Sequence, residues 1–266
     1  MAGGKRNLIL GFCTGYRLSA IEPFLASAVE LGDSARLCLF TNGLDEAFYH
    51  AASRHGIRVE DASPYLNMDY HPQNSRYFAY RQFIRDTAAE YNQVLMTDVR
   101  DVFFQSDPFA IRHPRPVCIS LEDTRIKWEP THNQRWLRDI YGEDVLADVT
   151  ENFVACSGTT IGTMQGVAAY LDVLCTELET RAYDRMQVYD QGIHNYIVWK
   201  LRPDWAWIDT GDSVVNTVGC TSPERIEVMD DLAVVDGRVP PVVHQWDRHA
   251  HLRALVERAP RFRLPG

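Results

Sequence analysis

Asp98 and Asp101 are the residues whose types and spacing are best suited to chemistry. The apolar run 94–96 precedes them, and a second apolar run, 102–104, follows them. A short apolar run bounded by turn residues is typical of a buried strand, and open α/β sheets bind ligands at the carboxyl ends of such strands. Two carboxylates a few residues apart at a bend can bind one divalent cation, because Mg²⁺ and Mn²⁺ prefer oxygen ligands. The alternative is that both acids only end a strand and cap a turn. Their place between apolar runs disfavours it, since a buried charge is costly unless it is paired or metal-bound.

The elements that must position these acids alternate between strands and helices. The first half of the chain predicts strands over 7–13, 36–40 and 57–59, helices over 18–31 and 45–55, and a loop over 61–74. A helix over about 75–91, with Asn74 or Ser75 as its N-cap, leads directly into the strand that carries Asp98. This alternation indicates a parallel α/β sheet.

The second half of the chain carries further polar residues at strand ends and turns. It predicts a strand over 116–121 that ends at Glu122 and Asp123, a helix over 133–151, a strand, Ser-Gly turn and second apolar step within 152–163, a helix over 164–181, and a hairpin over 224–235 turned at Asp236 and Gly237. Asp190 begins a helical run, where an Asp is most often a simple N-cap. His244 follows two valines, where a histidine is more often a hydrogen-bonded core residue than a ligand.

The segment 96–109, MTDVRDVFFQSDPF, resembles the metal-binding strand of GT-A glycosyltransferases, which use nucleotide-sugar donors. Many of those read Asp-x-Asp, an apolar stretch, then Asp-Pro-Phe or Asp-Pro-Leu. Here the pattern is a variant, Asp-x-x-Asp, with Val99 at the first acid position and Asp98 one residue earlier. The segments 152–163 and 190–192 resemble, in the same order along the chain, those of retaining GT-A enzymes of the glycogenin and galactinol synthase type.

This resemblance implies a single GT-A domain over 1–266: a Rossmann-like, mostly parallel sheet flanked by helices, with a small antiparallel portion. Residues 1–109 would form the nucleotide-binding half and 110–266 the acceptor-side half. The implied activity is transfer of a sugar, with retention, from a nucleoside diphosphate sugar to a hydroxyl acceptor. A UDP-sugar is the first expectation.

The resemblance also implies roles for individual residues. Asp98, Asp101 and His244 would hold Mn²⁺ or Mg²⁺, and Asp190 and Gln191 would lie beside the anomeric carbon. The expected donor-binding residues are Thr14, Gly15, Tyr16, Asn42, Arg81, Gly158, Thr159 and Arg248, and the expected acceptor-binding residues are Glu122, Asp123 and Asn152. The alternative for Arg81 is that it has no ligand and lies with Arg85, four residues later, on a basic, solvent-exposed face of the helix.

Bulk properties narrow the class of protein. A net charge of −9 disfavours wholesale binding to nucleic acid or to an anionic membrane. The apolar run near the start is too short for a signal peptide, and no stretch approaches a transmembrane length. The six cysteines are scattered without a Cys-x-x-Cys pair, which indicates buried free thiols and a reduced, cytoplasmic compartment.

Two other functions are compatible with paired acids after a strand. A haloacid-dehalogenase-like phosphohydrolase needs Asp-x-Asp, and here one residue too many separates Asp98 from Asp101. A non-catalytic nucleotide- or sugar-binding domain would keep the fold and bind its ligand without turnover.

Overall fold

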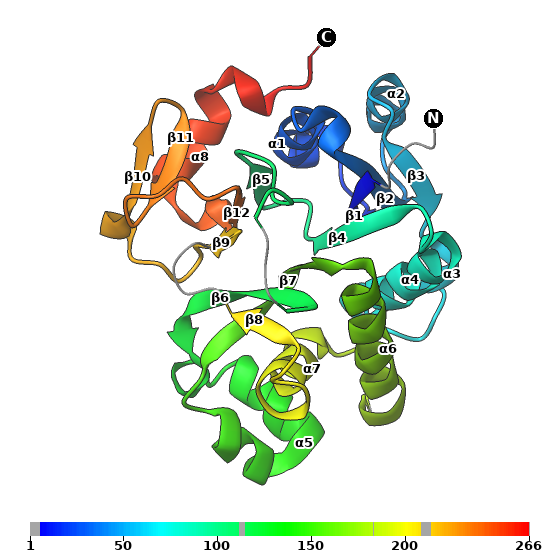
Figure 1. Ribbon diagram of the computed structural model, residues 1–266, viewed down its shortest axis with the longest axis vertical. Coiled ribbons are helices and arrows are strands. Elements are labelled where there is room, and N and C mark those ends of the chain that lie inside the picture. Colours follow the sequence, from blue (N-terminus) through cyan, green and yellow to red (C-terminus); the bar gives the residue numbers. More distant parts are fainter. Residues whose placement is uncertain (1–5, 112–114, 183, 209–213, 266) are drawn as a thin grey trace.

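In the computed structural model, one large mixed sheet runs through the molecule (Figure 1). The structure describes residues 6–111, 115–182, 184–208 and 214–265. Within these residues, ten strands join the sheet in the order β3-β2-β1-β4-β7-β6-β9-β12-β5, with β8 paired to β6. These strands are β1 (Arg6–Thr14), β2 (Ala35–Asn42), β3 (Arg58–Asp61), β4 (Tyr91–Thr97), β5 (Val102–Phe104), β6 (Val117–Arg125), β7 (Phe153–Thr163), β8 (Ala206–Ile208), β9 (Val215–Thr217) and β12 (Val242–His244).

Most neighbouring strands are parallel, as the sequence predicts. β3, β2, β1 and β4 are parallel, and so are β6, β9 and β12. β7 is antiparallel to both β4 and β6, and β5 is antiparallel to β12. A separate hairpin, β10 (Ile226–Met229) with β11 (Leu232–Val235), forms the small antiparallel portion.

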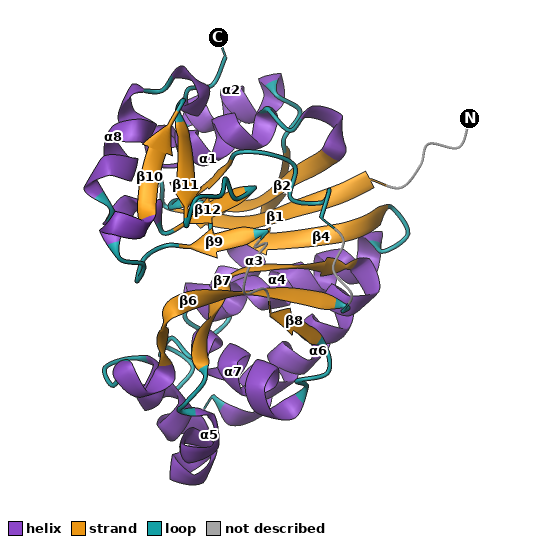
Figure 2. Ribbon diagram, turned by 60° about the vertical axis from the view of Figure 1, so that its left-hand side comes forward, coloured by secondary structure: helices purple, strands orange, loops and turns teal. Residues whose placement is uncertain are grey.

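Helices cover both faces of the sheet (Figure 2). They are α1 (Leu18–Val29), α2 (Glu46–Arg54), α3 (Ser63–Leu66), α4 (Pro72–Thr87), α5 (Asn133–Val149), α6 (Met164–Arg181), α7 (Asp190–Tyr196) and α8 (Ala250–Arg258). On one face, α4, α6 and α7 pack on β1, β4 and β7 around buried aromatic side chains such as Tyr80 and Tyr170. On the other face, α1 and α2 pack around Phe24 and Phe48, and α8 joins the hairpin around Phe103. Among the described residues, no helix is long and apolar enough to cross a membrane.

The predicted helices and strands of the first half are confirmed within a few residues, but α4 begins earlier than expected. Its N-cap is His71, whose Nδ1 accepts from the Gln73 amide at 3.3 Å, and not Asn74 or Ser75. Pro72 is the first helical residue, where its fixed φ and missing N–H suit a helix start. The predicted 61–74 loop also contains the short helix α3.

Three predictions in the second half were wrong in detail. The segment 153–163 is one continuous strand without a Ser-Gly turn, because β4 and β6 pair with it on either side. Glu122 and Asp123 lie inside β6 and not after it. The turn between β10 and β11 is at Asp230 and Asp231, whose φ values of 49° and 59° suit a tight hairpin turn. The chain also turns at Asp236 and Gly237, as predicted, but this turn follows β11 and pairs Val235 with Arg238.

The predicted helix over 164–181 is confirmed, and its start is capped by Thr163. The Thr163 hydroxyl accepts a hydrogen bond from the Gly166 amide at 3.0 Å. We therefore expect Thr163→Ala to lower the free energy of unfolding by about 1 kcal/mol, because one amide of the first turn loses its acceptor. Urea denaturation measures this loss. Thr163→Ser, which keeps the hydroxyl, serves as the control, and equal stability of the Ala and Ser variants would contradict the assignment.

Candidate active site

A pocket of about 690 Å³ opens at the carboxyl ends of β1 and β4, beside β7, β12 and the start of α7. Its volume is in the range of small-molecule sites. Ten of the predicted site residues line it: Thr14, Tyr16, Asp98, Asp101, Glu122, Gly158, Asp190, Gln191, His244 and Arg248. The structure thus brings together residues that lie up to 234 positions apart, from Thr14 to Arg248 (248 − 14).

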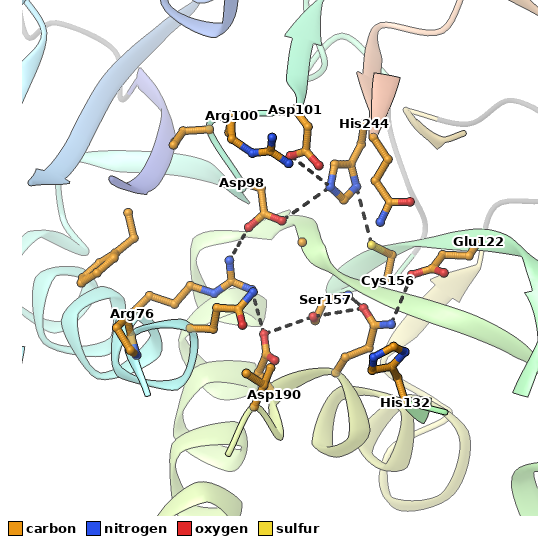
Figure 3. Close-up of a pocket in the computed structure, with 18 of the residues that line it drawn as sticks. Arg76, Asp98, Arg100, Asp101, Glu122, His132, Cys156, Ser157, Asp190 and His244 are labelled. Atoms are coloured by element: carbon orange, nitrogen blue, oxygen red, sulfur yellow. Dashed lines mark hydrogen bonds and ion pairs between the residues drawn. The ribbon is translucent and has the colours of Figure 1, made fainter. Parts of the chain in front are cut away.

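Asp98, Asp101 and His244 form a compact cluster in this pocket (Figure 3). His244 Nε2 lies 3.5 Å from Asp98 Oδ2 and 3.8 Å from Asp101 Oδ1. One possible ligand atom from each residue lies within 4.8 Å of the others. Such spacing lets all three side chains reach one cation.

Backbone hydrogen bonds hold the cluster in place from two sides. The Asp98 amide donates to the Gly158 carbonyl at 2.7 Å, which ties the end of β4 to β7. The Gln245 amide donates to the Asp101 carbonyl at 2.8 Å, which ties the acid loop to the end of β12. Gln245 itself has a left-handed backbone, with φ of 61°, directly after His244. The chain thus turns sharply at the point where the histidine enters the site.

The cluster has the properties of a metal site. His244 Nε2 is buried and, among the described residues, has no hydrogen-bond partner although it faces two carboxylates. At Gly158, an added Cβ would lie 2.6 Å from Asp98 Oδ2 and 2.6 Å from His244 Cε1, so only glycine leaves room beside these two side chains. Two carboxylates suit Mg²⁺ and Mn²⁺, and the imidazole favours the transition metal of the two.

The charges of the cluster are strongly coupled. Burial opposes ionisation of Asp98, but Arg76 and His244 outweigh it and hold the pKa of Asp98 well below its usual range. Burial also opposes the charged imidazole, but Cys156 and the two carboxylates raise the pKa of His244 well above its ordinary value. Because a histidine ligand must be neutral, a bound cation would displace this proton.

Arg76 links the cluster to the other side of the pocket. Its guanidinium pairs with Asp98 through Nη1 and with Asp190 Oδ2 through Nη2 at 2.8 Å (Figure 3). The same Asp190 oxygen accepts from the Tyr77 hydroxyl and the Ser157 hydroxyl, both at 3.2 Å. Asp190 is the first residue of α7 and Tyr189 is its N-cap, so the carboxylate binds these donors and is not a simple cap.

Arg76 occupies the position predicted for Arg81, which lies elsewhere. Arg81 pairs with Glu179 on α6 at 2.9 Å and does not line the pocket. The reason is the direction of α4: a helix that leads into β4 runs antiparallel to it, so its first turns lie beside the carboxyl end of the strand. Five residues further along, Arg81 is about 7.5 Å farther from that edge.

Gln191 and Glu122 form a second polar group in the pocket. Gln191 Nε2 donates to Glu122 Oε1 at 3.2 Å and to Asn133 Oδ1 at 3.1 Å. Its Oε1 accepts from the Ser157 amide at 3.3 Å, so the amide has a fixed orientation. Burial raises the pKa of Glu122. His132 completes this side of the pocket.

The remaining predicted residues lie outside the pocket lining. Gly15 turns the chain after β1 with φ of 70°, and the side-chain Nδ2 of Asn42 donates to Ser63 Oγ at 2.6 Å. Thr159 is buried behind the pocket, 2.7 Å from Ser120 Oγ. Asp123 pairs with Arg225, and the backbone of Asn152 bonds Val149 and Ile126.

Sequence reasoning missed several residues that do line the pocket: Arg76, Arg100, His132, Asn133, Trp136 and Ser157. The direction of α4 could have identified Arg76 instead of Arg81. Ser157 lies within the segment 152–163, where the predicted Ser-Gly turn is replaced by the continuous strand β7 that passes the site. For His132, Asn133 and Trp136, no sequence signal placed the start of α5 at the pocket.

No family model matches the chain, and no curated protein matches its sequence. Among solved structures, it is similar to the galactosyltransferase LgtC, whose structure was determined in complex with donor and acceptor sugar analogues. The TM-score is 0.50 and the sequence identity 15%, and the alignment covers 94% of each chain. At this identity the likeness shows the fold alone: the chain has a GT-A fold, and the predicted fold class is confirmed.

Arg76 and Arg81 offer a matched pair of variants on one helix. We expect Arg76→Ala to lower the free energy of unfolding by about 3 kcal/mol or more, since it leaves two carboxylates of the pocket without their common cation. Arg81→Ala removes a partly exposed pair with Glu179 and should cost less than about 1 kcal/mol. Urea denaturation at neutral pH compares them, and equal losses would contradict the bridging role of Arg76.

Proposed function

We propose that this chain is a metal-dependent glycosyltransferase that moves a sugar from a nucleoside diphosphate sugar, a UDP-sugar in the first instance, to a hydroxyl acceptor. The observation that carries the proposal is the joint geometry of the pocket. A three-residue cation site, Asp98, Asp101 and His244, faces Asp190 and Gln191 across one cavity of a GT-A fold. The likeness to LgtC supports the proposal, because that protein was solved with donor and acceptor sugar analogues.

The nucleotide side of the pocket is formed by β1 and the acid loop. Thr14 is the last residue of β1 and Tyr16 follows two positions later, and both would border the nucleotide. A divalent cation on Asp98, Asp101 and His244 would supply Lewis-acid stabilisation of the diphosphate leaving group. Arg248, exposed at the pocket, would add positive charge for the diphosphate, a task for which its planar guanidinium is suited.

Asp190 and Gln191 would act on the sugar. Three donors hold Asp190 Oδ2, so the carboxylate is fixed in position and can stabilise positive charge that develops at the anomeric carbon. The Gln191 amide, fixed by Ser157 on one side and Glu122 on the other, can orient the sugar without moving.

The acceptor would enter on the side of Glu122, where Asn133, His132 and Trp136 also line the pocket. Carboxylate and amide oxygens there can accept hydrogen bonds from sugar hydroxyls, and Trp136 offers an apolar surface for a sugar ring. Retention of the anomeric configuration is part of the proposal and follows from the resemblance of 152–163 and 190–192 to retaining enzymes.

The metal assignment predicts nucleotide binding that depends on Mn²⁺. With UDP at about 100 times its dissociation constant, linkage stabilises the folded state by about 2.7 kcal/mol, and this should appear as a rise in Tm only when Mn²⁺ is present. Asp101→Asn should abolish the Mn²⁺-dependent rise. Asp123→Asn is the matched control, because its carboxylate pairs with Arg225 outside the pocket. An unchanged rise in Asp101→Asn would contradict the metal assignment.

The catalytic assignment predicts that Asp190→Asn lowers turnover far more than donor affinity. We expect kcat for transfer of the donor sugar to water to fall by about 10² or more, because the charge that faces the anomeric carbon is lost. The KM for the donor should change little. Release of UDP from UDP-sugars measures both constants. An unchanged kcat would remove Asp190 from the chemistry, and binding of nucleotide by wild type without any turnover would instead indicate a non-catalytic binding domain.

A further inference from the structure

The second imidazole nitrogen of His244, Nδ1, contacts a buried chain of hydroxyl groups. Thr217 Oγ1 lies 3.3 Å from Nδ1. The Thr217 hydroxyl donates to Ser120 Oγ at 3.2 Å, and Ser120 Oγ lies 2.7 Å from Thr159 Oγ1. All four side chains are buried, with exposed fractions of 5% or less. We refer to Thr217, Ser120 and Thr159 as the hydroxyl chain.

Sheet topology builds this chain from segments far apart in the sequence. Its members and His244 come from β12, β9, β6 and β7, which are neighbours in that order in the sheet. His244 and Thr217 are register partners in the parallel pair of β12 and β9. The three members of the hydroxyl chain thus lie on three neighbouring strands, and His244 lies on a fourth, so strand pairing fixes the backbone of all four residues.

The direction of these hydrogen bonds determines which nitrogen of His244 carries a proton. A hydroxyl has one hydrogen to donate, and that of Thr217 goes to Ser120. The Thr217 oxygen can therefore only accept from the imidazole, which requires a proton on Nδ1. In a neutral imidazole the other nitrogen, Nε2, then presents a lone pair to Asp98 and Asp101.

Cys156 is the other neighbour of Nδ1, with Sγ at 3.6 Å. A thiol is a weak donor and a weak acceptor, so it tolerates either tautomer and cannot select one. Thr217 therefore selects the tautomer of His244.

We propose that Thr217, oriented by Ser120, is a positioning residue that holds His244 in the tautomer with a proton on Nδ1 and thereby makes Nε2 a metal ligand. The inference rests on the metal site of the proposed function and extends it to residues that do not touch the cation. Without the Thr217 oxygen, a buried Nδ1–H would lack an acceptor, and the neutral ring would favour a proton on Nε2, where the carboxylates accept it. Before Nε2 could bind a cation, the proton would then have to move from Nε2 to Nδ1, where it would have no acceptor.

Thr217→Val tests this positioning role, because valine keeps the shape of threonine and lacks the hydroxyl. We expect its dissociation constant for Mn²⁺, measured by the electron paramagnetic resonance signal of free Mn²⁺, to rise about 10–100-fold. Thr217→Ser should restore most of the affinity. The affinity for Mg²⁺, measured by displacement of Mn²⁺, should fall less, because Mg²⁺ depends mainly on the carboxylates. Ser120→Ala, a smaller change, should weaken Mn²⁺ binding in the same direction.

Thr87→Val is the matched control, since Thr87 is also buried and its hydroxyl donates to the Phe83 carbonyl at 2.7 Å, away from the pocket. It should leave the Mn²⁺ affinity unchanged. Wild-type affinity in Thr217→Val would overturn the inference while leaving the metal site intact, and so would equal losses for Mn²⁺ and Mg²⁺, which would indicate general distortion. Absence of Mn²⁺ binding by the wild type would overturn both the metal site and the inference.

Discussion

The pairing of one buried guanidinium with two carboxylates is the interaction on which the rest of the site depends. Arg76 lies between Asp98, which follows β4, and Asp190, which begins α7. Asp101 and Glu122 line the same pocket. Without Arg76, the negative charges of Asp98 and Asp190 would lack their shared positive partner, which is costly because Asp190 is buried. Arg76 also fixes the separation between the proposed cation site and the helix that carries Asp190, and the proposed transfer reaction needs these two groups at a fixed distance.

The sheet determines where these charges can meet. β1 and β4 end at the pocket, and β7 passes it in the opposite direction, so Gly158 and Ser157 border the site from the middle of a strand. β12 then brings His244 back beside the acids from the far end of the sequence. Ser157, Gly158 and His244 belong to paired strands, and backbone hydrogen bonds from Asp98 to Gly158 and from Gln245 to Asp101 tie the acid loop to those strands. The left-handed turn at Gln245 follows directly after His244.

Local sequence patterns were sufficient for the acid strand and for most helices and strands, since apolar runs and turn residues are read within one segment. They could not identify Arg76, whose place depends on where α4 starts and which way it runs against β4. Nor could they find Thr217, which meets His244 only because β9 and β12 pair across 27 positions. Thr159 shows the same limit: its segment was chosen correctly, but its side chain belongs to the hydroxyl chain behind the histidine and not to the pocket lining.

In the proposed function, Asp98, Asp101 and His244 hold one divalent cation together with a nucleoside diphosphate. Anomalous diffraction from crystals grown with Mn²⁺ and UDP tests it most directly, because it locates the metal without assuming its ligands. We expect one strong manganese peak among the two carboxylates and His244 Nε2, with the diphosphate of UDP beside it. A manganese peak elsewhere, or bound UDP with no metal among these three side chains, would contradict it.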